Sequence, residues 1–231
     1  MALFVIADLH LSFGSAKPMD VFEGWEDHVP RLERNWRAVV NPEDTVVLPG
    51  DVSWGMTLEK ALPDFAFLHG LPGTKIIMKG NHDYWWNSRK KIEGLWAAHG
   101  LDSLRLLHNN AFAAEGYALC GSRGWFFDCG EPEEKIVLRE AGRVRMSIQA
   151  GKRLPEGQAG NLLVFLHYPP IVNGQACVEI MDVLISEGVR RCYYGHLHGQ
   201  SIKWAHRGLH KGIHFDLISA DALGFMPKRV A

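Results

Sequence analysis

The chain has 231 residues, of which 47% are hydrophobic and 22% are charged, and its formal net charge is −1. This length and composition predict one domain, residues 1–231, with a substantial core, although two domains would also fit the length. A charge so close to zero excludes a general electrostatic attraction to nucleic acid or to an anionic membrane, because both require a positive surface.

Short apolar runs alternate with longer amphipathic stretches along the chain, which predicts an α/β protein. The first run, Ala2 to Ala7, lacks a basic leader and continues directly into Asp8. It is therefore expected to be a strand and not a secretory signal. The expected strands are Leu3 to Ala7, Thr45 to Leu48, Lys75 to Met78, Tyr117 to Gly121, Leu162 to Leu166, Arg191 to Tyr194 and His214 to Ser219.

The expected helices fall between these strands. Val29 to Val40 places its apolar residues on one side at helical spacing. Ser88 and Gly100 are the expected N-cap and C-cap of a helix over Arg89 to His99. A segment that contains proline and glycine, Leu154 to Gly160, is expected to be a surface loop. The remaining expected helices are Glu133 to Gly151 and Val178 to Ile185.

Polar side chains able to bind metal follow the apolar runs. They are, in chain order, Asp8, His10, Asp51, Asn81, His82, Asp83, His167, His196 and His198. Open α/β sheets place their binding crevices at the carboxyl ends of strands, so we expect one crevice to hold them all. Carboxylate, amide and imidazole groups form a mixed donor set that suits Mn²⁺, Fe²⁺ or Zn²⁺. The donors suffice for two ions but not for two closed cages, which leaves positions for water and substrate.

These residues belong to the ordered motifs DxH, GD, GNHD, H and GHLH, which extend from Asp8 to His198. Each motif is weak by itself, but five in order, each after an expected strand, make coincidence very improbable. The pattern resembles the calcineurin-like metallophosphoesterase superfamily, and the chain is similar to an uncharacterised bacterial branch of it. The resemblance implies a four-layer αββα sandwich, in which helices flank two mixed β-sheets.

The resemblance also implies two divalent metal ions as cofactors. One ion would be held by Asp8, His10, Asp51 and His198, and the other by Asp51, Asn81, His167 and His196. Asp51 would bridge the pair, and a water between two cations ionises near neutral pH. The expected activity is hydrolysis of a phosphomonoester or phosphodiester by attack of this bridging hydroxide.

Further residues next to the motifs have expected roles. By the same resemblance, His82 would contact the substrate alongside Asn81 without binding metal, and would donate a hydrogen bond or a proton. Asp83 could hold the protonated form of His82. The segment Gly121 to Glu131 is either a core strand followed by a turn, or a loop over the metals in which Arg123 binds phosphate.

Several aromatic residues follow the motifs closely. They either form an apolar rim for the leaving group or pack in the core, and they are Trp54, Tyr84, Trp85, Trp86 and Tyr168. The segment GDVSWG, from Gly50 to Gly55, lacks the arginine that protein phosphatases of this superfamily use for phosphate. Protein phosphatase activity is therefore disfavoured.

Two other functional classes fit the motifs, namely an interaction module with the same fold and a structural zinc protein. Retention of His82 and of all seven expected ligands favours an enzyme that acts on a small phosphate ester. No segment is long enough to span a membrane, and no signal specifies an oligomeric state. A reducing cytoplasm is expected, because four cysteines lack CxxC spacing: Cys120, Cys129, Cys177 and Cys192.

Overall fold

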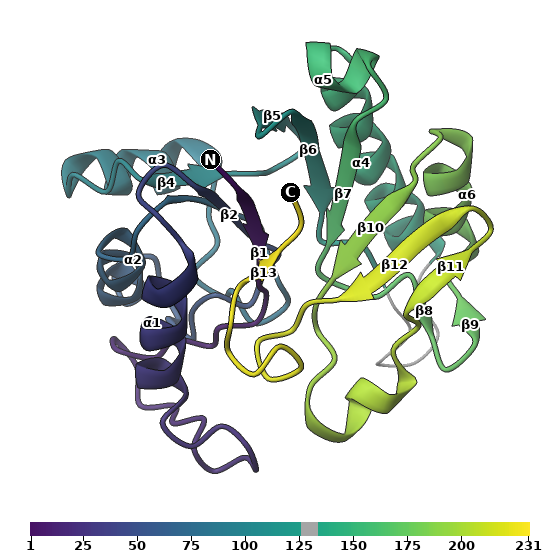
Figure 1. Ribbon diagram of the computed structural model, residues 1–231. Helices are drawn as coiled ribbons and strands as arrows, with labels where there is room; N and C mark the ends of the chain where they lie inside the picture. Colours follow the sequence, from purple (N-terminus) through teal and green to yellow (C-terminus); the bar gives the residue numbers. More distant parts are fainter. Residues whose placement is uncertain (126–133) are drawn as a thin grey trace.

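The computed structural model describes residues 1–125 and 134–231. Two mixed β-sheets pack face to face, and helices cover the outer face of each (Figure 1). This is the four-layer αββα sandwich that the sequence resemblance implied.

The first sheet has the strand order β13-β1-β2-β3-β4. Strands β1 to β4 are parallel, and β13 pairs with β1 in the antiparallel direction. Three helices cover its outer face, namely α1 (His28–Val39), α2 (Leu62–His69) and α3 (Arg89–Ala98). The strands are β1 (Leu3–Val5), β2 (Thr45–Leu48), β3 (Thr74–Ile77), β4 (Leu104–Leu106) and β13 (Lys228–Arg229).

The second sheet has the strand order β11-β12-β10-β7-β6-β5, with antiparallel pairs only at its two edges. Helices α4 (Glu134–Lys152) and α6 (Val178–Ser186) cover its outer face (Figure 1). The strands are β5 (Ala111–Ala114), β6 (Tyr117–Ser122), β7 (Leu162–Leu166), β10 (Arg191–Tyr194), β11 (Gly208–His210) and β12 (Ile213–Leu217). The smaller elements are α5 (Pro155–Gln158), β8 (Ile171–Val172), β9 (Gln175–Ala176) and η1 (Gly199–Trp204).

The strands alternate their side chains between two apolar layers. In β1, Leu3 and Val5 face the other sheet, whereas Phe4 packs against the helices. In β7, Leu163 and Phe165 likewise contribute to the layer between the sheets. Because both faces of each sheet are covered, most residues of the parallel strands are buried, and the polar residues expected to bind metal follow at their carboxyl ends.

Two local expectations need correction. The segment Leu154 to Gly160 is not wholly a loop, because Pro155–Gln158 forms the short helix α5, with proline at its favoured first position. Ser88 is the N-cap of α3, as predicted, although its side chain makes no cap hydrogen bond. The helix ends at Ala98 with His99 as its C-cap, and Gly100 follows with φ +67°.

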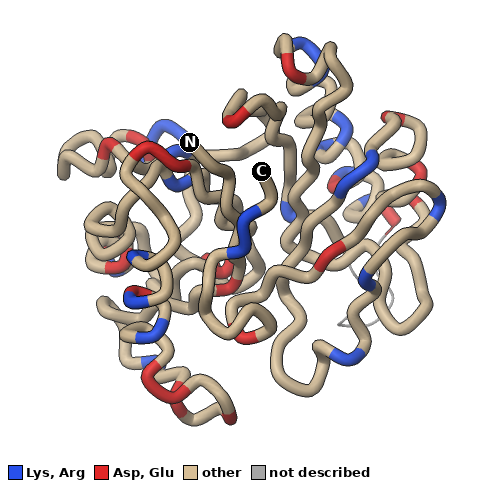
Figure 2. The backbone as a smooth tube through the Cα atoms, in the orientation of Figure 1, with Lys and Arg blue, Asp and Glu red and all other residues tan. Residues whose placement is uncertain are grey.

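Charged residues are interspersed along the backbone in the view of Figure 2, in agreement with the net charge of −1. Among residues 1–125 and 134–231, no helix has the length and hydropathy needed to cross a membrane.

Candidate metal centre at the strand ends

The strand ends of both sheets bring the expected metal ligands together. The ligand atoms form two groups, and within each group they all lie within 4.8 Å of one another. One group is Asp8, His10 and His198, and the other is Asp51, His167 and His196. The seventh expected ligand joins the second group, because Asn81 Oδ1 lies 2.6 Å from His167 Nε2 and 3.0 Å from His196 Nδ1. Residues more than 180 positions apart in the sequence thus meet at one edge, as the position after each strand predicted.

The two groups are neighbours. Asp51 Oδ2 lies 3.9 Å from His10 Nε2 and 3.5 Å from His167 Nε2. The first group is closed by His198, whose Nε2 lies 3.3 Å from His10 Nε2 and 3.7 Å from Asp8 Oδ1. Asp51 therefore lies close to histidines of both groups.

The unpaired oxygen atoms in this cluster fit divalent cations. Asp8 and Asp51 are 0% and 1% exposed, yet Asp8 Oδ1 and Asp51 Oδ2 have no hydrogen-bond partner. The other oxygen of each carboxylate is used, because Asp8 Oδ2 accepts from His196 N at 2.9 Å and Asp51 Oδ1 accepts from His82 N at 2.8 Å. Buried polar atoms without partners are rare and costly, and positive ions beside these oxygens would stabilise them.

The backbone at the centre is held in an uncommon conformation. Asp8, His10, Asp51 and His196 have φ angles of 61°, 47°, 50° and 73°, in the left-handed region that non-glycine residues seldom adopt. Such strain persists only where the surrounding structure enforces it, and it concentrates at functional sites. Gly80 permits the close packing, because a Cβ there would lie 2.0 Å from Asp51 Oδ1.

Burial sets the protonation states of the metal-free cluster. It raises the pKa of Asp8 to about 7 and lowers the pKa values of His10 and His167 well below the usual range. Neutral imidazole is the form of histidine that binds metal. His10 and His167 are therefore in the metal-binding form at neutral pH, whereas the nearby carboxylates of Asp8 and Asp221 raise the pKa of His198 against the effect of burial.

Hydrogen bonds orient two of the histidines. His167 Nδ1 lies 3.1 Å from the Pro49 carbonyl, which accepts its proton and leaves Nε2 toward Asp51. His198 Nδ1 lies 3.2 Å from Asp221 Oδ1, and the Gly199 amide donates to Asp221 Oδ2 at 2.7 Å. Carboxylate and carbonyl partners of this kind fix the tautomer of metal-binding histidines. Asp221 is not among the residues predicted from the sequence, although it follows the last expected strand by two residues, the same signal that identified the ligands.

Asp83 has a different place from the one expected. Its Oδ2 accepts from the backbone amides of Gly80 at 2.7 Å and Asp51 at 2.9 Å. Its Oδ1 accepts from the amides of Val52 and Ser53 and from Trp85 Nε1, at 2.9, 3.3 and 2.9 Å. The carboxylate thus ties the GD and GNHD loops together instead of holding protonated His82.

His82 lines a cavity of about 610 Å³ together with the metal-group residues His10 and His198. Its Nδ1 lies 3.2 Å from Tyr84 Oη, and its ring packs 4.5 Å from Trp54. Burial lowers the pKa of His82 below its usual 6.5. The imidazole is therefore neutral at neutral pH, in contrast to the imidazolium that the sequence analysis considered.

Arg123 lines a separate cavity of about 310 Å³, in which none of the seven expected ligands takes part. Its guanidinium lies 3.7 Å from the fully buried Glu140, and its carbonyl accepts from the amides of His167 and Tyr168. The core-strand alternative holds as far as Ser122, where β6 ends. The rest of the aromatic segment, from residue 126 to Glu131, lies outside the described residues.

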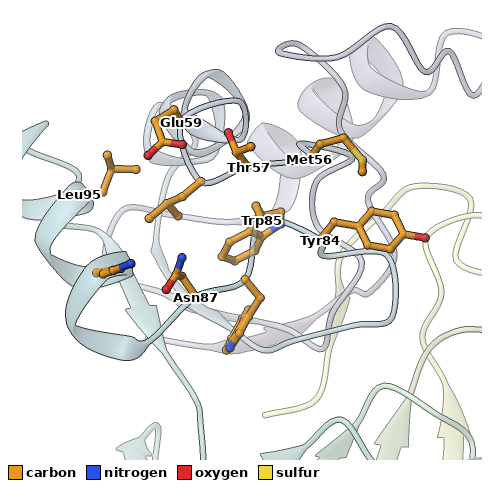
Figure 3. A pocket seen from close by; sticks show the side chains of 10 residues that line it. Met56, Thr57, Glu59, Tyr84, Trp85, Asn87 and Leu95 are labelled. Atoms are coloured by element: carbon orange, nitrogen blue, oxygen red, sulfur yellow. The ribbon is translucent and has the colours of Figure 1, made fainter.

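The aromatic residues divide between core and site. Trp85 is 1% exposed and packs on Phe65, and with Trp86 it lines a third cavity of about 470 Å³ that contains no metal-group residue. Figure 3 shows this cavity, with Tyr84 directed away from the Trp85 ring. Trp54 instead stacks on His10 at 5.0 Å, and Tyr168 is buried with its ring 4.6 Å from His196.

Comparison with known proteins agrees with this geometry. A family described as calcineurin-like phosphoesterase matches residues 1–200. The fold is similar to that of a phosphopantetheinyl hydrolase from Mycobacterium tuberculosis, with 13% identity, coverage of 99% of this chain and 95% of that chain, and a TM-score of 0.55. It is also similar to the protein TT1561 of Thermus thermophilus, with 17% identity, coverage of 85% of this chain and 81% of that chain, and a TM-score of 0.52. No curated protein matches the sequence. At these identities the solved structures show the fold alone.

Proposed function

The chain belongs to the calcineurin-like phosphoesterase family, whose chemistry is metal-dependent hydrolysis of phosphate esters, and from this premise we propose hydrolysis of a phosphomonoester or phosphodiester at a two-metal centre. The observation that carries the proposal is the pair of adjoining ligand groups, each with a buried carboxylate oxygen that lacks a partner. The protein's own part is to position the donors and to orient the substrate.

We assign Asp8, His10, Asp51 and His198 to one ion and Asp51, Asn81, His167 and His196 to the other, with Mn, Fe or Zn as the metal. The mixed oxygen and nitrogen donors support this choice. When bound, the two ions supply an activated water near neutral pH and positive charge for the phosphoryl oxygens.

His82 is the residue that we assign to the substrate. The Tyr84 hydroxyl, 3.2 Å from His82 Nδ1, can donate to that atom and leave Nε2–H as the donor to a phosphoryl oxygen. His82 is held in place by its amide hydrogen bond to Asp51 and by packing against Trp54. A neutral donor beside the metal groups fits its lowered pKa better than a cation would.

We further propose that residues 1–231 form a single domain that acts on a small phosphate ester in a reducing cytoplasm. The layer of apolar side chains shared by the two sheets supports one domain. Within the described residues, Cys120, Cys177 and Cys192 are buried free thiols, which supports a reducing compartment.

The proposed function is tested by assaying the purified chain against chromogenic phosphate mono- and diesters. Removal of metal with a chelator is expected to abolish hydrolysis, and addition of Mn²⁺ to restore it, because the unpartnered carboxylate oxygens act only through ions. Tight metal binding without turnover of any ester would instead favour an interaction module or a structural metal protein.

Substitution of His82 by Asn is expected to lower kcat by about 100-fold while two ions remain bound, because His82 contacts substrate and not metal. Metal content is measured by elemental analysis alongside kcat. Since the pKa of His82 is lowered, the ring is already neutral above pH 6.5, and the ratio of wild-type to variant activity should stay constant as pH rises toward about 8.5. A ratio that falls tenfold per pH unit would show that the imidazolium acts, and loss of metal would show that His82 is a ligand.

A further inference from the structure

The cavity beside the metal groups has an apolar wall that the proposed reaction does not itself require. His10, His82 and His198 form one side of this cavity of about 610 Å³. The other lining residues are Met19, Phe22, Glu23, Trp25, Trp54, Gly199 and Gln200. A phosphoryl group at the metals would fill only a small part of this volume, since pockets of about 300–1,000 Å³ hold whole drug-sized ligands. The remaining space adjoins His10, His82 and His198 and has room for a larger group attached to the phosphate.

Met19, Phe22, Trp25 and Trp54 form the apolar wall, and most of these side chains are held by contacts with other residues. Trp25 is 2% exposed and packs its ring against His10, His198 and Phe225, with centroid distances of 5.7, 5.6 and 5.0 Å. Met19 is 7% exposed, and its sulfur accepts a hydrogen bond from Trp54 Nε1 at 3.3 Å. The segment before α1 is thus anchored onto the metal-site residues by its own apolar side chains.

Phe22 differs from these anchored residues, because it lines the cavity and yet is 55% exposed. Burial of an exposed aromatic ring by an apolar ligand is favourable, because apolar surface is removed from water. Because Phe22 lies on the same segment as Met19 and Trp25 and lines the cavity, burial of its ring would stabilise an apolar ligand bound there.

The charges of the lining restrict what the cavity accepts. Glu23 is the one residue of fixed charge in the lining, and within the described part of the chain neither Lys nor Arg contributes to it. Lys17 is not part of the lining, although its Nζ lies 4.4 Å from the centre of the ring of Trp54, which is. A second phosphate or carboxylate on the leaving group would therefore lie near the Glu23 carboxylate, with no Lys or Arg among the described lining residues to pair with it.

We propose that the substrate is a phosphate ester of an apolar alcohol, with the alcohol portion in this cavity against Phe22, Met19 and Trp54. The proposal rests on the proposed function for the position of the phosphoryl group. It adds the class of leaving group, which is uncharged and apolar, and it disfavours nucleotide-like leaving groups with further phosphates.

Turnover of matched esters tests the proposal. The probes are ethyl phosphate, 2-(1-naphthyl)ethyl phosphate, decyl phosphate and 3-carboxypropyl phosphate. The added groups lie at least two carbons from the ester oxygen, so the chemistry of the leaving oxygen is nearly constant and kcat/KM reports the cavity. We expect kcat/KM for the naphthylethyl or the decyl ester to exceed that for ethyl phosphate by about 30-fold. The ester with the higher kcat/KM shows whether the cavity prefers a ring or a chain. Equal kcat/KM for the apolar esters and ethyl phosphate would overturn the proposal.

Charge exclusion is tested with the carboxypropyl ester. It is expected to be a poorer substrate than ethyl phosphate, and Glu23→Gln should raise the ratio of its kcat/KM to that of ethyl phosphate about threefold. A carboxypropyl ester that matches the decyl ester in the wild-type chain would contradict an apolar class of substrate.

Binding provides a readout that does not depend on turnover. Calorimetry with the full metal-free chain and 2-(1-naphthyl)ethanol or decanol is expected to show saturable binding. Phe22→Ala should weaken that binding about fivefold, whereas Leu209→Ala, at a 73% exposed position on β11, should leave it unchanged. Binding without hydrolysis of any ester would contradict the proposed function alone. The apolar-alcohol proposal would be overturned, whatever the activity, if neither alcohol bound. It would also be overturned if Phe22→Ala and Leu209→Ala had equal effects on binding.

Discussion

Substitution of Asp51 by Asn is expected to lower kcat/KM by about 1,000-fold or more and to reduce the metal content below two ions per chain. Asp51 Oδ1 accepts a hydrogen bond from His82 N, so this position requires an oxygen. The NH₂ group of the introduced amide must then take the place of Oδ2, which lies between His10 and His167. A nitrogen that carries two protons offers no lone pair to a cation, and the negative charge shared by both sites is lost.

The measurement pairs kcat/KM with elemental analysis of the purified variant. Asp216→Asn is a matched control, because Asp216 pairs with Lys228 away from both ligand groups. It should retain both ions and wild-type activity. If the Asp51 variant keeps two ions and its kcat/KM falls by less than about threefold, Asp51 is not the bridge.

The positions of the metal-site residues follow from the sequence because they depend on local signals. Each expected ligand comes directly after an apolar run, and parallel strands align their carboxyl ends whatever their order in the sheet. The strands Thr45–Leu48, Leu162–Leu166 and Arg191–Tyr194 have the predicted bounds, since their runs are apolar and sharply ended. Strands such as β8 and β13 contain two residues each, too few for any periodicity to show.

Helix α2 was not predicted for a different reason. Its sequence, LPDFAFLH, is apolar on most sides, so it lacks the one-sided pattern by which a surface helix is found. It is held by packing, with Phe65 and Leu68 fully buried against the first sheet. Tertiary burial, and not a local signal, determines this helix.

The direction of a polar side chain depends on partners that the sequence does not place nearby. Arg123 was considered as a phosphate ligand, but its guanidinium lies near Glu140, which belongs to helix α4. Asp83 was considered as a partner for His82, yet its carboxylate oxygens face backbone amides of a loop about thirty positions earlier in the chain. Backbone amides are the same in every residue, so no pattern of side chains reveals where they converge.

The effect of changing Asp83 follows from that convergence. Substitution by Asn is expected to lower the free energy of unfolding by about 3 kcal/mol and to weaken metal binding. Oδ2 serves two backbone amides, and Oδ1 serves two more and the Trp85 indole. Whichever way the new amide turns, its NH₂ group faces at least two N–H donors. These become unsatisfied in the core, and the loops that carry Asp51 and Asn81 lose their common anchor.

Urea denaturation of the metal-free chain measures the loss of stability, and titration with Mn²⁺ measures the loss of affinity. Trp85→Phe is the matched control, because it removes one donor to Asp83 while keeping the carboxylate and an aromatic ring. It should cost only about 1 kcal/mol. If Asp83→Asn instead lowered kcat with stability and metal affinity unchanged, Asp83 would act in catalysis. The five hydrogen bonds to its carboxylate argue for the structural role, since they occupy both oxygens and leave neither one for a proton transfer to His82.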